Sequence, residues 1–214
     1  MSEAKELAGP ALARKSGVVI LAAGSSSRMG RPKLLLPWGA TSVLGHQIQT
    51  WRSLSVGQIA TVVAAGDTTV QADLDRLGFS TRDRILNPHP EEGMFSSIRC
   101  AAVWQGWYEG LTHWVISLGD QPHVRLETLR RLLDFSASQP AKACQPRRLG
   151  HLRHPVILPK ALFERLRDAS GPSLKDFLRA SAEPVAACDV DDPGLDLDLD
   201  EPADYEKALA LYKP

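Results

Sequence analysis

The stretch VVILAAGSSSRMGRPK, residues 18–33, decides the fold of this chain. Its first part, 18–21, is a short β-branched apolar run, which is typical of a buried strand. The small residues that follow let a ligand approach the backbone closely, and their consecutive N–H groups can bind an anion. Arg28 and Lys33 then supply two cations. A strand, an N–H-rich loop and two cations are the parts that a polyphosphate site needs.

Two common glycine-rich phosphate motifs do not match this loop. The dinucleotide fingerprint G-x-G-x-x-G is excluded because three serines follow Gly24. The Walker A motif is excluded because Arg31 and Pro32 separate Gly30 from Lys33. The alternative to a phosphate site is a plain Gly/Ser turn with two solvated cations.

Length and composition indicate an ordinary globular chain. The 214 residues are 43% apolar and 23% charged, which favours a single domain. The formal net charge of zero argues against a nucleic-acid partner held by charge alone. We expect no membrane span, and we expect residues 1–16 to form a mobile leader because they lack a signal-like apolar core. Three widely spaced cysteines without a C-x-x-C pair favour a cytoplasmic location.

Strands and helices alternate in the first half of the sequence. Strands are expected at 18–21, 58–65, 84–86 and 113–118. Helices are expected at 43–54, at 68–77, from the segment 93–97 to an end near Trp107, and at 126–135. This alternation predicts a parallel sheet with helices on both faces, in which ligands bind beyond the carboxyl ends of the strands. The loop after 18–21 and Asp120, which follows 113–118, should then share one edge of the sheet.

The second half is less regular. It predicts strands at 142–145, 154–158, 185–190 and 195–200, and helices at 160–167, 173–179 and 202–212. In the last predicted strand, leucine alternates with Asp196, Asp198 and Asp200, which would place the three acids on one sheet face. Like charges in that arrangement repel unless they are solvated or bridged by a cation. The alternative is that Asp200 caps the terminal helix.

LAAGSSSRMGRPK resembles the signature L-A-A-G-x-S-x-R-M-G-x-P-K of the MobA-like nucleotidyltransferases, with every fixed position present. The resemblance implies a three-layer α/β/α, Rossmann-like (GT-A-like) nucleotide-diphospho-sugar transferase fold with a mostly parallel mixed sheet. It also implies one nucleotidyltransferase domain over 17–214. In that domain 17–138 would bind the nucleotide, 139–191 would bind the acceptor, and 192–214 would form a metal strand and a terminal helix.

The resemblance assigns roles to individual residues. Arg28, Lys33 and Asp120 would be catalytic, and Asp120, in the family's G-D-x-P motif, would hold Mg²⁺. LDLDEPAD at 197–204 resembles the family's D-[IV]-[DN]-T-P-E-D and places a second Mg²⁺ ligand on Asp200. EGMFSSI at 92–98 resembles a segment near the nucleotide, whereas a plain helix cap is the alternative. The residues that would bind the nucleotide are Leu21, Ala22, Ala23, Gly24, Ser25, Ser26, Ser27, Gly30, Gly93, Ser96 and Ser97.

Two features favour the cytidylyltransferase branch of the family. Ala22-Ala23-Gly24 resembles the branch that uses CTP, whereas the branch that uses GTP more often has Ala-Gly-Gly. His154-Pro-Val resembles the acceptor motif G-H-P-V, with Arg153 in place of the glycine. The implied reaction is Mg²⁺-dependent transfer of CMP from CTP to a molybdopterin-type cofactor, with a molybdoenzyme as the protein served. The alternatives are GTP, a different phosphorylated acceptor, or a non-catalytic protein that delivers the cofactor.

Overall fold

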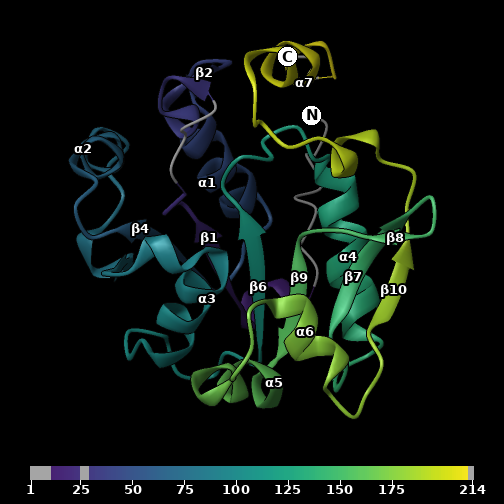
Figure 1. The fold of residues 1–214 in the computed structure, drawn as a ribbon. Coiled ribbons are helices and arrows are strands. Elements are labelled where there is room, and N and C mark those ends of the chain that lie inside the picture. The colour runs from purple at the N-terminus through teal and green to yellow at the C-terminus, as the bar shows by residue number, and fades with distance from the viewer. Residues whose placement is uncertain (1–10, 25–28, 212–214) are drawn as a thin grey trace, which may run out of the picture.

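A computed structural model describes residues 11–24 and 29–211 and shows one central sheet between helices (Figure 1). The strands of this sheet are β1 (Ser16–Leu21), β4 (Gln58–Ala64), β5 (Arg84–Asn87), β6 (His113–Leu118), β7 (Cys144–Arg148), β8 (His151–Leu152), β9 (Val156–Pro159) and β10 (Ala186–Asp189). A separate two-stranded ribbon pairs β2 (Pro37–Trp38) with β3 (Thr41–Ser42).

The central sheet has the order β10-β7-β9-β6-β1-β4-β5, with β8 paired to β7. Strands β6, β1, β4 and β5 are parallel, and β10 is parallel to β7. Strand β9 runs antiparallel to both of its neighbours, and β8 runs antiparallel to β7. The predicted mostly parallel mixed sheet is therefore confirmed.

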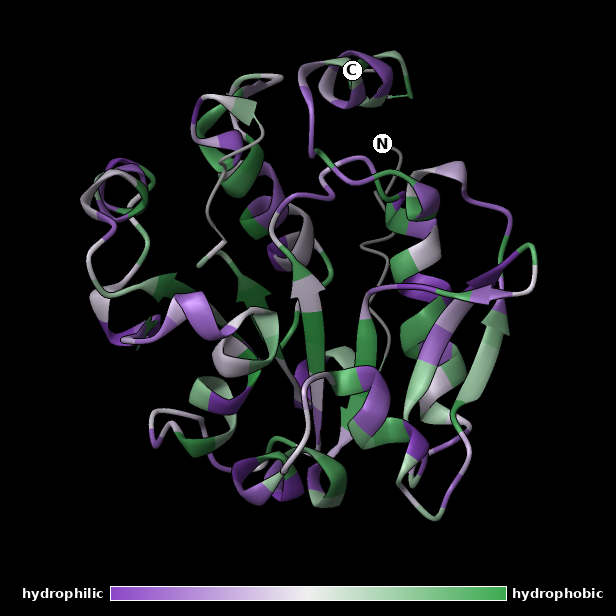
Figure 2. Cartoon of the chain, in the orientation of Figure 1, coloured by the Kyte–Doolittle hydropathy of each residue, from purple (hydrophilic) through white to green (hydrophobic). Residues whose placement is uncertain are grey.

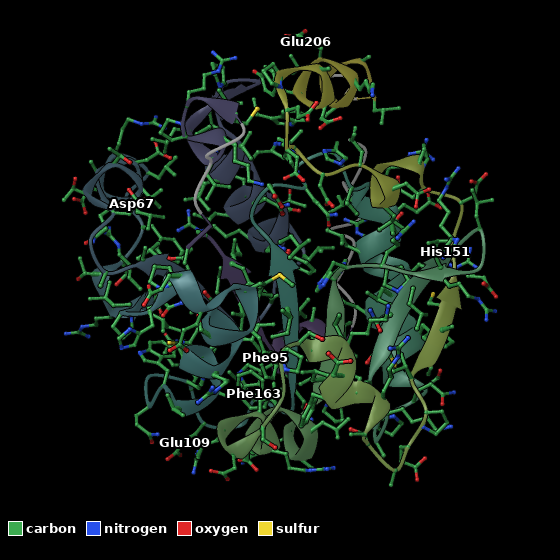
Figure 3. All side chains as sticks on the ribbon, in the orientation of Figure 1. Asp67, Phe95, Glu109, His151, Phe163 and Glu206 are labelled. Carbon is green, nitrogen blue, oxygen red and sulfur yellow. The ribbon has the colours of Figure 1, made fainter. Side chains whose placement is uncertain are left out.

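The helices are α1 (Val43–Ser53), α2 (Thr68–Arg76), α3 (Met94–Val103), α4 (Leu126–Ala137), α5 (Lys160–Arg165), α6 (Leu174–Arg179) and α7 (Pro202–Leu211). Two apolar layers pack against the two faces of the sheet. One layer draws its buried residues from α1, α2, α4 and α7, and the other from α3, α5 and α6. Phe95 of α3 and Phe163 of α5, labelled in Figure 3, belong to the second layer.

The strands between these layers are apolar because both of their faces are covered. Val18 and Ile20 of β1 face one layer and Val19 faces the other, and all three are fully buried. Figure 2 shows the same pattern as green along β6 and β9. In β6, Val115 and Ile116 face opposite layers. The three-layer architecture is thus set by the apolar runs of the sequence.

Helix α3 ends at Val103, earlier than the predicted end near Trp107. The chain turns there so that Trp107 can be packed against its neighbours. Its ring centroid lies 4.9 Å from that of Trp104 and 5.9 Å from that of Trp114. Its indole N–H donates to the carbonyl oxygen of Ala101 at 2.9 Å. Aromatic packing of the half-buried Trp107 therefore replaces the last helical turn.

The prediction of a strand at 195–200 is wrong. A 3₁₀ helix, η7 (Pro193–Asp196), occupies its start, and 197–200 has no regular secondary structure. Pro193 begins the 3₁₀ turn and the side chain of Asp192 accepts from the N–H of Gly194, which fixes a turn where the alternation indicates extended chain. Consequently Asp196, Asp198 and Asp200 do not share a sheet face.

The ordered fold begins before Gly17. Leu12 and Ala13 are buried, η1 (Ala13–Lys15) precedes β1, and Ser16 is the first residue of that strand. Residues 1–10 of the predicted leader lie outside the described residues. Within 11–24 and 29–211, no helix is long and apolar enough to cross a membrane.

Candidate active site

A cleft of about 660 Å³, the first cleft, opens at the carboxyl edge of the parallel strands. It is built from the loops that follow β1, β5 and β6, from the chain before β9, and from the segment before α7. This is the edge at which the sequence predicts the ligand site. The lining residues are Leu21, Ala23, Gly24, Lys33, Leu34, Pro90, Glu91, Gly93, Met94, Ser97, Leu118, Asp120, His154, Asp198 and Asp200.

The loops after β1 and β6 touch each other. The N–H of Gly119 donates to the carbonyl oxygen of Leu21 at 3.0 Å. A Cβ atom on residue 119 would lie 2.6 Å from that oxygen, which is closer than any side chain allows. The glycine of the Gly119-Asp120 pair therefore lets the Asp120 loop lie against the end of β1.

Lys33 joins the two predicted metal ligands. Its Nζ lies 2.5 Å from Oδ2 of Asp120 and 3.2 Å from Oδ1 of Asp200. The side chains of Lys33 and Asp120 are 15% and 17% exposed, so this ion pair is partly shielded from water. Burial lowers the pKa of Lys33, but the charges and hydrogen bonds of Asp120 and Asp200 outweigh it and raise the pKa above 10.5. Lys33 is thus held as an ammonium.

Carboxylates dominate the charge of the first cleft. Among its described lining residues, Glu91, Asp120, Asp198 and Asp200 are acidic, and Lys33 supplies the one ammonium group. Two converging carboxylates suit a divalent cation, because Mg²⁺ is usually bound through one or two carboxylates plus phosphate oxygens and water. No cluster of three or more His, Cys, Asp or Glu that could hold a metal occurs in 11–24 or 29–211. Asp120 and Asp200 therefore fit a cation that a phosphate ligand helps to hold.

Five hydrogen bonds fix the irregular segment that carries Asp198 and Asp200 and the turn before it. Gln121 Nε2 donates to Oδ1 of Asp198 at 2.7 Å. The imidazole N–H of His123 donates to the carbonyl oxygen of Leu197 at 2.8 Å. Upstream, the buried carboxylate of Asp192 accepts from the backbone N–H of Arg125, from the hydroxyl of Thr128 and from the N–H of Gly194. The loop after β6 thus holds Asp198 directly, and Asp200, two residues on, is held by its ion pair with Lys33.

The predicted nucleotide residues divide into three groups. Leu21, Ala23, Gly24, Gly93 and Ser97 line the first cleft. Ala22, Gly30 and Ser96 are not among its lining residues. The Ser96 hydroxyl donates to backbone carbonyl oxygens and accepts from Asn87, so it serves the start of α3. Ser25, Ser26, Ser27 and Arg28 lie outside the described residues.

His154 lies between the first cleft and a second cleft of about 730 Å³. It shares this boundary with Met94. Burial lowers the pKa of His154, so its imidazole favours the neutral form. The second cleft is lined by Met94, Gln145, Gly150, His151, Leu152, Arg153, His154, Val156, Ser173, Leu174, Lys175, Leu178, Arg179, Ser181, Ala182, Glu183, Pro184 and Val185. Apart from Met94, all of these fall within the predicted acceptor part, 139–191.

Several lining residues were not predicted as site residues. Asp198 belongs to the same alternation of leucine and aspartate as Asp200. The strand predicted at 195–200 would place it on the same face as Asp196, so the pattern does not distinguish the two acids. Met94 lies in the EGMFSSI segment directly after Gly93, and its apolar side chain gives no signal of a contact to either cleft. The sequence signals their neighbourhood, whereas the contacts to both clefts depend on tertiary structure.

Comparison with known proteins gives a family match. Residues 18–185 match the family model of the MobA-like NTP transferase domain. The bifunctional protein GlmU of Pseudomonas fluorescens is 33% identical over 159 residues, which cover 72% of this chain and 31% of that protein. The chain therefore spans about a third of the length of this curated relative.

Solved structures share the fold over nearly the whole chain. A homologue of Mycobacterium tuberculosis Rv0371c, from Mycobacterium sp. strain JC1, has 25% identity and a TM-score of 0.74, covering 92% of this chain and 96% of that one. Rv0371c from M. tuberculosis H37Rv, solved as a manganese complex, has 26% identity and a TM-score of 0.66, covering 91% and 98%. These likenesses show that the neighbours share the overall fold of this chain.

Proposed function

The chain belongs to the family of MobA-like NTP transferase domains, and from this premise we propose that it transfers CMP from CTP to the phosphate of a molybdopterin-type cofactor. The observation that carries the proposal is the meeting of Lys33, Asp120 and Asp200 in one cleft. Lys33 is separated by 87 positions from Asp120 and by 167 from Asp200. A fold that brings one ammonium and two carboxylates together beside a second cleft suits transfer between two anionic substrates.

The proposed reaction makes one bond and breaks one. An oxygen of the acceptor phosphate attacks the α-phosphorus of CTP and forms a new P–O–P linkage. The bond from the α-phosphorus to the bridging oxygen of the β-phosphate breaks, and pyrophosphate leaves with that electron pair. The acceptor phosphate is already ionised, so no general base is required.

Lys33 would stabilise the negative charge of the triphosphate during this exchange. Phosphoryl and nucleotidyl transfer need little covalent work from the protein, so positioning and charge stabilisation carry most of the catalysis. The ammonium of Lys33 is fixed and partly buried, which strengthens its electrostatic effect. Arg28, outside the described residues, is proposed to act on the same phosphates.

Asp120 and Asp200 would hold a divalent cation. When bound, Mg²⁺ would neutralise charge on the phosphate oxygens. The manganese complex of the related Rv0371c supports a divalent ion in this family. The sequence resemblance favours Mg²⁺, with both carboxylates as its protein ligands.

The second cleft would receive the acceptor. It adjoins the first cleft at His154 and Met94, so an acceptor there could present its phosphate to the nucleotide. Lys175 and Arg179 lie one helical turn apart on α6 and both line this cleft. These side chains, together with Arg153, favour an anionic acceptor.

Pyrophosphate release tests the proposal. The protein is incubated with Mg²⁺, molybdopterin cofactor and each of the four nucleoside triphosphates in turn. We expect release with CTP that depends on the acceptor, and a loss of at least ~100-fold in Asp120→Asn. Asp134→Asn, on the exposed side of α4, is the matched control and should retain activity. The proposal fails if Asp120→Asn turns over like the wild type.

The same assay separates the alternative functions. Release with GTP in place of CTP would assign the GTP-using reaction. Release with CTP only when another phosphorylated acceptor is supplied would reassign the acceptor. Cofactor binding without any release would favour a delivery protein. The charged groups of the first cleft argue against that last function, because delivery alone does not require two carboxylates beside a lysine.

A further inference from the structure

One carboxylate connects the hairpin beside the second cleft to the segment that leads into the first cleft. Asp196 accepts a hydrogen bond from Arg148 on Oδ2 and another from Arg153 on Oδ1, the latter at 2.8 Å. Because each oxygen is used by a different guanidinium, the orientation of the carboxylate is fixed. Burial raises the pKa of Asp196, but hydrogen bonds from Arg148 and then Arg153 outweigh it and hold the pKa below 3.8.

The two arginines flank the hairpin beside the second cleft. Arg148 ends β7 and Arg153 follows β8, so they flank the hairpin on which Figure 3 labels His151. Arg153 lines the second cleft. Its own backbone is held by the hairpin, because its N–H donates to Pro146 and its carbonyl oxygen accepts from Gln145. Movement of this hairpin would therefore shift both guanidinium groups and, through their hydrogen bonds, the carboxylate of Asp196.

Asp196 itself does not line the first cleft but precedes two residues that do. It ends η7, and the next residues, 197–200, have no regular secondary structure of their own. Asp198 and Asp200, which line the first cleft, lie only a few residues farther along. An irregular segment keeps its side chains in place through tertiary contacts, so the loss of one anchor affects the acids that follow it.

We propose that Asp196 is a positioning residue that couples the second cleft to Asp200, through Arg148 and Arg153. This inference rests on the proposed function, in which Asp200 holds a divalent cation. Partners that orient a metal ligand without touching the metal govern affinity by fixing that ligand. Asp196 would fix the whole segment 197–200 that carries Asp200. Because Arg148 and Arg153 hold Asp196, a ligand in the second cleft would change the position of that segment.

The chain offers a matched control for this ion pair. Arg147 binds Asp189 through two hydrogen bonds, at 2.6 and 2.7 Å, between the neighbouring strands β7 and β10. Neither residue lines the first or the second cleft. Asp189→Asn thus removes a comparable arginine–aspartate pair from the same sheet edge without touching the segment that carries Asp200.

Manganese binding in the presence of CTP tests the coupling, with free Mn²⁺ followed by electron paramagnetic resonance. We expect Asp196→Asn to weaken Mn²⁺ binding about 10-fold. Arg148→Gln, which leaves Arg153 in place and touches neither cleft, should weaken it less. Asp189→Asn should stay within about twofold of the wild type. Saturating Mn²⁺ should restore turnover in Asp196→Asn, which an unfolded variant would not show.

The outcomes distinguish this inference from the proposed function. If Asp196→Asn binds Mn²⁺ as Asp189→Asn does, while Asp120→Asn and Asp200→Asn bind it poorly, the coupling is overturned and the metal site stands. If Asp120→Asn and Asp200→Asn also bind Mn²⁺ like the wild type, the proposed metal site fails and the coupling fails with it.

Discussion

Lys33 Nζ lies 2.5 Å from Oδ2 of Asp120, although the two residues are 87 positions apart. The same ammonium lies 3.2 Å from Oδ1 of Asp200. A divalent cation held by these carboxylates would compete with Lys33 for their oxygens. A triphosphate would instead attract the lysine, so nucleotide and metal should assist each other's binding.

Lys33→Met is expected to separate these two effects. Removal of the ammonium takes away one cation that competes for the oxygens of Asp120 and Asp200, so Mn²⁺ should bind the nucleotide-free protein about tenfold more tightly, as expected for one charged hydrogen bond. CTP should bind at least ~10-fold more weakly, because a phosphate partner is lost. Isothermal titration with each ligand measures both constants. Lys160→Met, an exposed lysine paired with Glu164, is the control. Weaker Mn²⁺ binding in Lys33→Met would contradict the competition.

Arg153→Gly should alter the handling of the acceptor more than that of CTP. Arg153 lines the second cleft and is not among the lining residues of the first. Loss of its guanidinium should change the KM for an anionic acceptor by about tenfold, whereas the KM for CTP, measured at saturating Mn²⁺ to offset the lost Asp196 contact, should change less. Steady-state rates of pyrophosphate release at varied CTP and acceptor give both values. Arg147→Gly makes the same change on β7 and serves as the control. An equal rise in both KM values would show that Arg153 also serves the nucleotide.

The sequence was sufficient to predict the parts that depend on local pattern. The run at Val18–Leu21 predicts β1, and the run at His113–Leu118 predicts β6 with Asp120 beyond its end. Parallel pairing of these strands then places the two loops on one edge, as the Gly119–Leu21 hydrogen bond confirms. Buried apolar runs and turn residues are local signals, which explains this success.

Tertiary contacts decided the parts that the sequence did not predict. The alternation at 195–200 indicates a strand, but no neighbouring strand pairs with it and a turn at Asp192–Gly194 takes its place. Asp196 is turned towards Arg148 and Arg153, which only the folded hairpin brings near. Similarly, Asn87 of β5 donates to both Ser96 and Ser97 of α3, a contact across two elements. Periodicity cannot encode such partners.

Asp192→Asn should destabilise the fold through one buried side chain. The Asp192 carboxylate is 1% exposed and accepts from the Arg125 N–H, the Thr128 hydroxyl and the Gly194 N–H. An amide nitrogen in place of one oxygen would leave a buried donor without an acceptor, which costs about 2 kcal/mol of unfolding free energy. Urea denaturation measures the loss. Asp191→Asn, whose side chain is 94% exposed, should change stability little. Equal stability of the two variants would contradict this role.

Buried histidines should make stability depend on pH. Burial lowers the pKa of His123 below 6.5, and hydrogen bonds to backbone carbonyl oxygens offset this only in part. Burial also lowers the pKa of His46, His113 and His154. Below pH 6.5 the unfolded chain therefore binds protons that the folded chain does not. The stability contributed by neutral His123 is fully present above its unfolded pKa and is lost as pH falls through the folded pKa.

The unfolding free energy should thus fall as the pH drops below about 6.5, by up to ~1.4 kcal/mol per pH unit for each such histidine. His123→Gln keeps an N–H donor for the carbonyl oxygen of Leu197 but cannot titrate. The unfolding free energy of this variant should therefore change less with pH, by an amount that corresponds to at most one bound proton. Urea denaturation at steps between about pH 5 and 7 measures the slopes. His151→Gln, an exposed histidine on β8, removes one histidine without altering the core. If His123→Gln and His151→Gln both keep the wild-type slope, His123 does not carry the pH dependence.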